Sequence, residues 1–277
     1  VFRKTVAIKS VLPHLFENEE YKDMFVREAQ MAVKLQHPNI VQILDYRKDD
    51  QQNICFIVME YIRGKNLGEI MAKLIQLDRG FRVDEATYIA SQVAKGLQYF
   101  HNYVDEPTGE TMSLIHRDIS PQNIMISYEG EVKISDFGIA KMPTDPSHTQ
   151  CGVIKGKPGY LSPEQVFPDQ RIDHRSDIYS LGIIFYEMLT GKRLFKFASE
   201  IEAYQQIPRI TIPPLAETVS HVSEELNRIV MKCLEKDRER RYQSAQALFD
   251  DLAELKNSET MSFDMDSLSK FMRKFFL

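Results

Sequence analysis

The sequence has few cysteines, and their spacing fits neither a zinc site nor a disulfide framework. Its three cysteines, Cys55, Cys151 and Cys233, are widely separated, and its seven histidines show no metal-ligand spacing. These features exclude a disulfide-stapled secreted scaffold and a structural zinc site. We therefore expect the protein to work in a reducing compartment.

Long apolar runs are also missing. No run approaches the ~18 residues needed to span a bilayer. The first ten residues, VFRKTVAIKS, lack the features of a signal peptide. We expect a cytoplasmic protein with no membrane segment within this chain, although regions outside it could tether it to a membrane.

The sequence lacks a strong excess of one charge. Charged residues make up 27% of the chain, the net charge is -5, and acids and bases are mixed along it. This balance argues against a nucleic-acid partner. With 43% hydrophobic residues, a chain of 277 residues can bury a sizeable core and fits one large domain or two lobes.

The hydrophobic pattern changes along the chain. Residues 4–11, 39–50 and 53–62 are rich in β-branched residues and predict strands, with a helical period over residues 19–36. After Gly64 the pattern becomes mostly helical, with helices predicted over residues 67–77 and 85–101. The sequence therefore predicts an α+β fold, with a small strand-rich part to about Glu60 and a larger helical part.

Two further segments have distinct patterns. Residues 103–114, YVDEPTGETMSL, predict a polar, turn-rich excursion. Near the end, Leu268, Phe271, Met272, Phe275 and Phe276 fall on one helical face. A closing helix packed on the protein is the favoured interpretation, while Arg273 and Lys274 leave a membrane or partner helix open.

Four short motifs occur in a fixed order: VAIK at 6–9, HRDISPQN at 116–123, DFG at 136–138 and SPE at 162–164. Any one of them is weak evidence, because such short strings occur by chance. Together, in this order and at these separations, they resemble the signature of the protein kinases. The pattern is most similar to that of the eukaryotic-type Ser/Thr kinases of bacteria.

The resemblance implies the two-lobed protein-kinase fold and a kinase that phosphorylates serine or threonine on protein substrates. It divides the chain into a partial N-lobe over residues 1–60, a C-lobe over 61–256 and a helical tail over 257–277. It also implies ATP and Mg²⁺ as cofactors. The N-lobe here lacks the first two strands and the Gly-rich loop of the family, because only eight residues precede Lys9. We interpret this as an incomplete sequence, and we expect a chain that began here to bind ATP poorly.

The resemblance assigns the catalytic roles to residues of these motifs. Lys9 matches the lysine that holds the α- and β-phosphates, and Glu28 matches its ion-pair partner. Asp118 matches the base that accepts the substrate proton, while Asn123 and Asp136 match the two Mg²⁺ ligands. In isolation Lys9 would be read as a strand-edge lysine, Glu28 as a solvated residue and Asp136 as a turn cap.

The nucleotide pocket follows by register from the same resemblance. Residues 59–66, MEYIRGKN, match the hinge between the lobes. The pocket would have a gatekeeper beside the adenine, two backbone positions that bind the adenine edge, two apolar side chains above and below the ring, and a polar residue at the ribose. Met59 would be the gatekeeper, and the backbones of Glu60 and Ile62 would bind the adenine edge. Ala7 and Met125 would lie above and below the ring, and Asn66 would contact the ribose.

The segment between Asp136 and Glu164 matches the activation segment. Arg117 matches the cation that binds a phosphate on this segment, and Thr149 is the favoured acceptor among Thr144, Ser147 and Thr149. Autophosphorylation in trans, possible within a dimer, would supply that phosphate; an ordinary loop threonine is the alternative. Two structural roles also carry over: a buried ion pair between Glu164 and Arg241, and the anchoring of the loop 116–123 by Asp177.

Two departures from the family pattern appear reciprocal. Ser/Thr kinases usually carry lysine where this chain has Ser120, and threonine where it has Lys157. Our hypothesis is that Lys157 reaches back towards Asp118 and Ser120 and restores the missing positive charge. The alternative is a solvated Lys157 and a slow enzyme.

Two rival functions remain at this level. A pseudokinase that acts as a scaffold or regulated binding module is favoured by Ser120 and the missing Gly-rich loop, and disfavoured by the complete set of catalytic residues. A small-molecule phosphotransferase is disfavoured by the long segment from residue 136 to residue 164, which in the family builds a surface for a peptide. Tyrosine specificity is disfavoured by the sequence of the loop 116–123.

Overall fold

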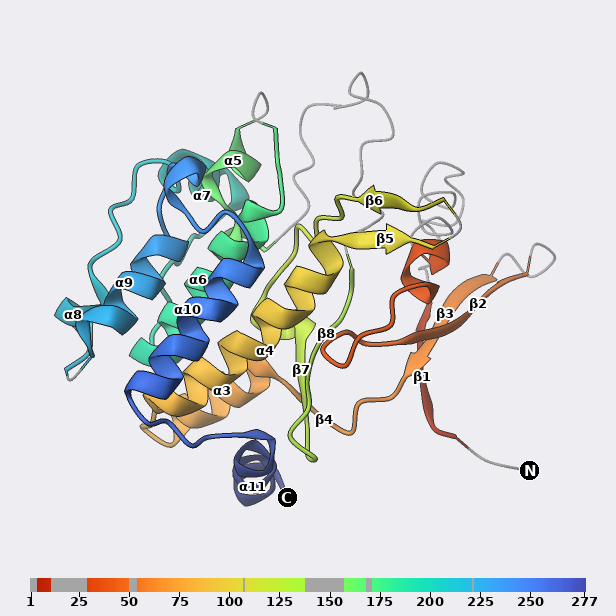
Figure 1. Ribbon diagram of the computed structural model, residues 1–277, viewed down its shortest axis with the longest axis horizontal. Coiled ribbons are helices and arrows are strands. Elements are labelled where there is room, and N and C mark those ends of the chain that lie inside the picture. Colours follow the sequence, from red (N-terminus) through yellow and green to blue (C-terminus); the bar gives the residue numbers. More distant parts are fainter. Residues whose placement is uncertain are drawn as a thin grey trace.

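The computed structural model describes residues 4–10, 29–49, 54–106, 108–137, 157–167, 171–220 and 222–277. Figure 1 shows a strand-rich part, drawn in red and orange, beside a larger helical part. The last strand of the sheet in the strand-rich part, β3, ends at Glu60. The predicted α+β architecture, with a small strand-rich N-lobe and a larger, mainly helical C-lobe, is confirmed.

The N-lobe sheet has three antiparallel strands in the order β1-β3-β2. Their bounds are Val6–Ser10 for β1, Ile43–Asp49 for β2 and Ile54–Glu60 for β3. β-Branched residues favour this pleated arrangement because their side chains pack well between strands. The register places Ala7 opposite Met59 and Lys9 opposite Ile57. Residues 29–33 form helix beside this sheet, with Ala29 and Ala32 buried.

A second three-stranded sheet, ordered β4-β7-β8, lies where the two lobes meet. Its strands are Gly64–Asn66 for β4, Ile124–Ser127 for β7 and Val132–Ile134 for β8. Ile124 and Ile126 are buried in the core, whereas Met125 between them is half-buried on the other face, as the alternation of a strand requires.

The C-lobe is built around α6, which spans Arg175–Thr190 and is buried over almost its whole length. A helix that is buried on every side lies in the interior of a domain. Around it lie several other helices and some short helices of a single turn. Their bounds are Leu67–Gln76 for α3, Val83–His101 for α4, Pro163–Val166 for α5, Glu200–Gln206 for α7, Leu215–Thr218 for α8, Glu224–Cys233 for α9, Ala245–Ser258 for α10, Pro121–Asn123 for η1, Pro158–Tyr160 for η4 and Arg238–Arg240 for η5.

Residues 103–114 contain a β-hairpin, where the sequence predicts only a turn-rich segment. Tyr103–Asp105 forms β5 and pairs antiparallel with Glu110–Met112, which forms β6. Asp105 is buried and forms an ion pair with Lys34, which lies at the end of the helix over residues 29–33. The distance from Lys34 Nζ to Asp105 Oδ1 is 2.6 Å. This tertiary contact, which the local sequence does not reveal, holds the hairpin against the N-lobe.

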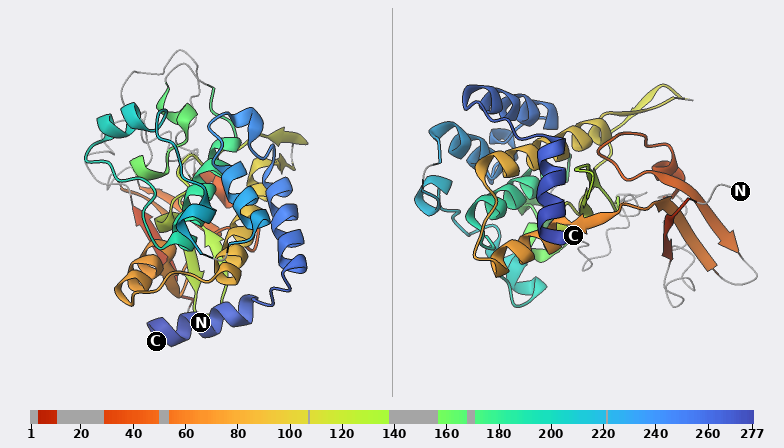
Figure 2. Two further views of the ribbon diagram at one scale, coloured as in Figure 1. Left: turned by 90° about the vertical axis from the view of Figure 1, so that its left-hand side faces the viewer. Right: turned by 90° about the horizontal axis from the view of Figure 1, so that it is seen from below.

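The chain closes with α11, Met265–Phe276, which packs on the C-lobe as predicted. Leu268, Phe271 and Met272 are buried, and Phe271 stacks on Phe81 at a centroid distance of 5.8 Å. The left view in Figure 2 shows α11 lying across the lower end of the molecule, and the right view, from below, shows it in front of the other elements. Within the part of the chain that the structure describes, helices with the length and apolarity to cross a membrane are absent.

Candidate active site

The lysine of VAIK and the aspartate of DFG meet between the two sheets. Lys9 on β1 places its Nζ 2.7 Å from Oδ1 of Asp136, which follows β8. Their side chains are 41% and 45% exposed, so the pair is open to a ligand. A hollow beside them is lined by Lys9, Met59, Asp136 and the apolar residues Ala32, Val41, Ile43, Ile57 and Phe137.

The backbone of Asp136 has φ 56°, a left-handed conformation that is uncommon outside glycine. Arg117, in the loop 116–123, has φ 63°. Such conformations persist where surrounding contacts impose them, and they concentrate at functional sites. Here they occur at two residues of the predicted site.

The loop 116–123 holds Asp118 and Asn123 together. The Asn123 side-chain amide donates to the backbone oxygen of Asp118 at 2.8 Å and to its carboxylate Oδ2 at 3.1 Å. The backbone oxygen of Asn123 accepts from the backbone N–H of Ser135, the residue before Asp136, at 2.8 Å. The loop is thereby fixed both to the predicted base and to the strand that leads to Asp136.

His116 has a structural position in this loop. Its side chain is fully buried, its Nδ1 accepts from the Asp118 N–H at 3.3 Å, and its Nε2 lies 3.1 Å from the Ser135 carbonyl oxygen. Because the carbonyl can only accept, Nε2 carries the proton and the ring is assigned the neutral tautomer. His116 therefore joins the loop to the end of β8, which agrees with its prediction as a packed residue.

Asp177 on α6 anchors the loop backbone, as predicted. Its carboxylate accepts from the backbone N–H of His116 at 2.9 Å and of Arg117 at 2.8 Å. Burial raises the pKa of Asp177, but the hydrogen bonds from the His101 side chain and from the His116 backbone N–H outweigh burial, and the net pKa lies below the usual value. A charged, buried Asp177 thus fixes the start of the loop.

Sequence reasoning missed His101, the last residue of α4. Its Nε2 lies 2.8 Å from Oδ2 of Asp177, and its side chain is only 3% exposed. A single histidine at the end of a predicted helix gives no local signal of such a role. It becomes visible only when α4 packs against α6.

The predicted adenine residues come together in pairs. Ala7 and Met59 are neighbours across β1 and β3, and Asn66 and Met125 are neighbours across β4 and β7. Ile62 lies buried in the connection between β3 and β4. The predicted pocket residues therefore lie along the strands that join the two lobes.

Two pocket residues also have structural partners. The Asn66 side chain caps α3, because its Oδ1 accepts from the Glu69 N–H at 2.9 Å. The Glu60 carboxylate accepts from the Gln42 N–H at 2.8 Å and from Lys133 Nζ at 2.9 Å. These bonds fix the two ends of the connecting segment.

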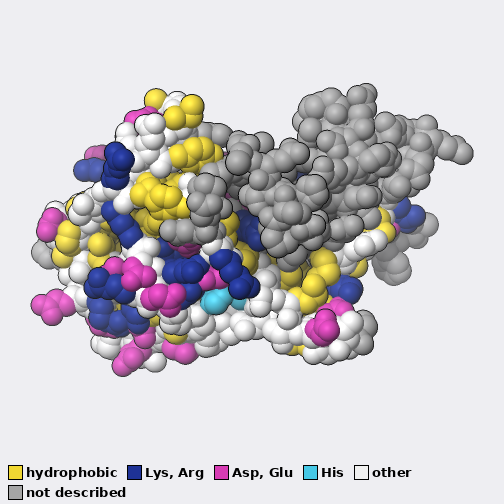
Figure 3. Space-filling view, turned by 90° about the horizontal axis from the view of Figure 1, so that it is seen from above, with side chains coloured by type: hydrophobic (Ala, Val, Ile, Leu, Met, Phe, Trp, Pro, Cys, Tyr) yellow, Lys and Arg dark blue, Asp and Glu magenta, His cyan; other side chains and the backbone are white. Residues whose placement is uncertain are grey.

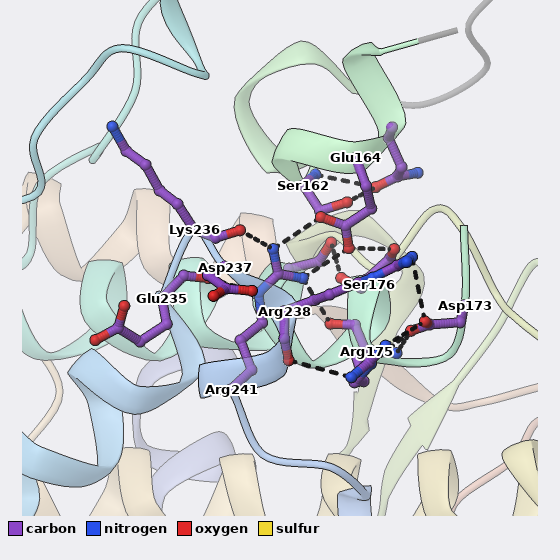
Figure 4. A network of polar contacts seen from close by, with 12 residues as sticks. Ser162, Glu164, Asp173, Arg175, Ser176, Glu235, Lys236, Asp237, Arg238 and Arg241 are labelled. Atoms are coloured by element: carbon purple, nitrogen blue, oxygen red, sulfur yellow. Dashed lines mark hydrogen bonds and ion pairs between the residues drawn. The ribbon is translucent and has the colours of Figure 1, made fainter. Parts of the chain in front are cut away.

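Glu164 and Arg241 form the predicted buried ion pair, shown in Figure 4. The two carboxylate oxygens accept from the guanidinium at 2.6 and 2.7 Å, and Ser176 Oγ donates to the same carboxylate at 2.6 Å. Arg241 also donates to the backbone oxygens of Glu235 and Lys236. The pair joins α5 to the segment before α10.

Lys157 lies close to the loop 116–123. Its Nζ donates to Ser120 Oγ at 3.3 Å and to Gln122 Oε1 at 2.9 Å. Gln122 is a second residue that sequence reasoning missed, and its place within the HRDISPQN motif was the available signal. The catalytic role of Lys157 stays a prediction.

Arg117 is half-buried, and burial lowers the pKa of its guanidinium while the charge of Asp177 raises it. Its backbone oxygen accepts from Gln165 Nε2 at 3.1 Å, which connects the loop 116–123 to α5. Glu28 and Thr149, the predicted partners of Lys9 and Arg117, lie outside the described residues. Those two pairings stay predictions.

Charges on the face shown in Figure 3 are mixed, with Lys and Arg side chains beside Asp and Glu. Ion pairs link such residues elsewhere in the described part of the chain too: Arg175 lies 2.8 Å from Asp173 and 3.0 Å from Glu239. Paired charges of this kind do not create a field of one sign. The visible surface therefore agrees with the mixed charge pattern of the sequence.

Comparison with known proteins gives consistent findings. A family model described as protein kinase domain matches residues 2–252. The chain is 35% identical over 251 residues to the tyrosine-protein kinase MasK of Myxococcus xanthus, covering 91% of this chain and 38% of MasK. It is 36% identical over 260 residues to a probable serine/threonine-protein kinase of Clostridium acetobutylicum, covering 93% of this chain and 37% of that protein.

The serine/threonine-protein kinase PknB of Mycobacterium tuberculosis is 35% identical over 261 residues, which is 92% of this chain and 39% of PknB. This chain thus spans well under half the length of these curated relatives. Among solved structures, a double mutant of the PknI kinase domain of Mycobacterium tuberculosis has a TM-score of 0.66 at 23% identity, covering 90% of this chain and 84% of that one. At that identity the likeness supports the fold alone.

Proposed function

This chain belongs to the protein kinase domain family, and from that premise we propose that it transfers the γ-phosphoryl group of ATP to serine or threonine hydroxyls of protein substrates. The observation that carries the proposal is the 2.7 Å contact between Lys9 and Asp136. These residues are far apart in the sequence, and their motifs match the two sides of a phosphate and metal site. A fold without this chemistry has no need to place both at one open hollow.

Asp118 is the proposed base. The substrate hydroxyl oxygen forms a bond to the γ-phosphorus, while the bond from that phosphorus to the β–γ bridging oxygen breaks and ADP leaves. The hydroxyl proton passes to the Asp118 carboxylate. The Asn123 amide, which donates to Asp118 Oδ2 at 3.1 Å, orients this carboxylate for the transfer.

Asn123 and Asp136 are the proposed Mg²⁺ ligands. The nitrogen of the Asn123 amide faces Asp118, so its oxygen faces away from that residue, and Asp136 supplies a carboxylate. Carboxylate and amide oxygens are hard ligands that suit Mg²⁺, which often binds one or two protein side chains plus substrate phosphates. The residues present fit this ion. When bound, Mg²⁺ neutralises charge on the phosphates.

The nucleotide would lie against the strands that join the lobes. We assign Lys9 to the α- and β-phosphates, with Glu28 as its partner, and Met59 to the gatekeeper position. The backbone of Glu60 and Ile62 would bind the adenine edge. The remaining contacts are the apolar ones above and below the ring and the ribose contact, from Ala7, Met125 and Asn66.

Regulation through the activation segment is part of the proposal. Phosphate on Thr149, added in trans by a second copy of the chain, would bind Arg117. Support comes from the position of Arg117, whose backbone is held by Asp177 on one side and by Gln165 on the other. A charge on the segment would thus be read at the loop that carries Asp118.

A scaffold without catalysis is less favoured, because all four of Lys9, Asp118, Asn123 and Asp136 are present, and Lys9 contacts Asp136 while Asn123 contacts Asp118. The named activities of the relatives include both tyrosine and serine/threonine kinases. The amino acid that accepts the phosphate therefore has to be identified by experiment.

The test is incubation of the protein with a generic protein substrate and Mg·ATP at a concentration high enough to offset weak ATP binding, followed by mass spectrometry that locates each phosphate. We expect phosphate on serine or threonine. With Asp136→Ala the rate of phosphorylation should fall at least about 10³-fold, because the variant lacks a ligand for the Mg²⁺ that would stabilise the charge on the transferring group. Absence of phosphate from both the chain and the substrate would favour the scaffold. Phosphate on tyrosine alone would change the substrate class.

A further inference from the structure

The ammonium group of Lys157 is held against the loop that carries the proposed base. Its Nζ contacts Gln122 Oε1 at 2.9 Å and Ser120 Oγ at 3.3 Å. Ser120 is fully buried, and Lys157 is half-buried. The Gln122 amide oxygen and the Ser120 hydroxyl oxygen are neutral acceptors, and these two contacts orient the ammonium group towards the loop 116–123.

The backbone of Lys157 is fixed from the opposite side. Lys157 is the N-cap of η4, and its backbone oxygen accepts from the Tyr160 N–H at 2.9 Å. The Tyr160 carbonyl in turn accepts from Ser180 Oγ on α6 at 2.7 Å. The Tyr160 hydroxyl donates to Glu187, also on α6, at 2.8 Å. The buried core helix α6 therefore fixes the position of the Lys157 backbone through Tyr160.

Ser120 is part of the same short loop as the two groups that would meet the phosphate. Its backbone oxygen accepts from the Asn123 N–H at 2.9 Å, and the Asn123 side chain contacts Asp118 Oδ2 at 3.1 Å. A cation held at the Ser120 hydroxyl is therefore next to the place where the acceptor hydroxyl and the γ-phosphoryl group must meet.

Phosphoryl transfer spreads negative charge over the oxygens of the transferring group, and a positioned cation stabilises that charge. We propose that Lys157 is a catalytic residue that contacts the γ-phosphoryl group during transfer, and that Ser120 and Gln122 position its ammonium. This inference rests on the proposed kinase activity. Under this proposal, the segment before α5 supplies a catalytic charge in addition to the peptide-binding surface that is expected of it.

The test compares steady-state phosphorylation by the wild type, Lys157→Ala and Lys157→Met, at saturating and limiting Mg·ATP. We expect kcat to fall about 10²- to 10³-fold in both variants, the size typical for losing one group that stabilises transition-state charge. KM for ATP should change less than threefold, because the contact strengthens in the transition state. Lys157→Met keeps most of the side-chain volume and separates charge from packing.

Two matched variants complete the design. Lys196→Ala removes an exposed lysine elsewhere in the C-lobe and should leave kcat unchanged. Ser120→Lys in the Lys157→Ala background returns an ammonium from the other side of the 3.3 Å contact and should recover at least tenfold in kcat. A merely structural Lys157 would not be rescued in this way.

The outcomes are distinct. If the wild type is active and Lys157→Met keeps kcat within twofold, the inference is wrong and the proposed function stands. If the wild type is no more active than Asp136→Ala, the proposed function itself fails. If kcat falls without rescue and the melting temperature falls with it, Lys157 is structural and the inference is overturned.

Discussion

Among single residues, Glu164 and Arg241 have side chains that are 2% and 0% exposed. Removing one partner of such a pair leaves a charge without water or counter-ion, which costs about 3–5 kcal/mol. We expect Glu164→Gln to lower the free energy of unfolding by that amount, measured by urea denaturation. Glu225→Gln is the matched control, because its ion pair with Arg228 is 43% and 46% exposed and should contribute at most about 1 kcal/mol. Equal losses in the two variants would contradict the role of burial.

The same residue makes a prediction about pH. Burial raises the pKa of Glu164, but the hydrogen bonds and charge of Arg241 and the bond from Ser176 outweigh it, leaving the pKa below its ordinary value of 4.5. Its contribution is therefore complete above that value and is lost as pH falls through the folded-state pKa. The stability difference between the wild type and Glu164→Gln should shrink as pH falls below 4.5. A constant difference down to acid would show that Glu164 is not held charged.

At the scale of elements, α11 lies beyond residue 252, where the match to the family model ends. It rests on the turn between β7 and β8: Ser269 Oγ donates to the Tyr128 carbonyl at 2.7 Å, and a Cβ on Gly130 would lie 2.1 Å from the Met265 oxygen. Gly130 has φ 91°, so glycine meets both the backbone conformation and the close approach. The helix thus braces the strand that carries Met125.

This contact predicts the effect of Phe271→Ala, which removes a buried ring that stacks on Phe81. Truncating a buried phenylalanine costs about 3–5 kcal/mol. Because α11 is at the end of the chain, we expect it to open locally before the rest unfolds, with amide hydrogen exchange at least about 100-fold faster in α11 and in the turn 127–131. Lys270→Ala, an exposed change on the same helix, is the control. Unchanged exchange in the turn would show that α11 does not brace it.

The elements also show what sequence could and could not predict. Alternation and helical period predicted β1, β3, α3, α4 and α11, because each pattern repeats within its own segment. Four ordered motifs predicted the residues that meet at Lys9 and Asp136. The β5–β6 hairpin was missed because its strands are only three residues long and it is held by Lys34, which is far away in the sequence. The contact of His101 with Asp177 was missed because it arises only when α4 packs against α6.

At the scale of the whole molecule, the two lobes are joined by a backbone bridge and an ion pair as well as by the chain segment that runs between them. The segment before β2 joins β8 through a bridge between Ile40 and Ile134. At the end of β3, the Glu60 carboxylate accepts from Lys133 Nζ, and their side chains are only 21% and 10% exposed. Lys133 is also the neighbour of Met125 across β7 and β8. The ion pair therefore ties the proposed adenine-binding segment to the floor of the pocket.

Breaking that tie should loosen the nucleotide site without removing any group that takes part in the chemistry. We expect Lys133→Met to raise KM for ATP about tenfold, since a hydrogen bond to a charged group contributes roughly 1.5 kcal/mol, while kcat stays within about twofold. Lys65→Met is the control, because Lys65 lies on β4 of the same sheet but pairs with Glu69 at the surface. The double variant with Glu60→Gln should lose little more than Lys133→Met alone, as expected for two partners of one interaction. If both lysine variants raise KM equally, or the double variant adds the two losses, the two lobes are not coupled through this pair.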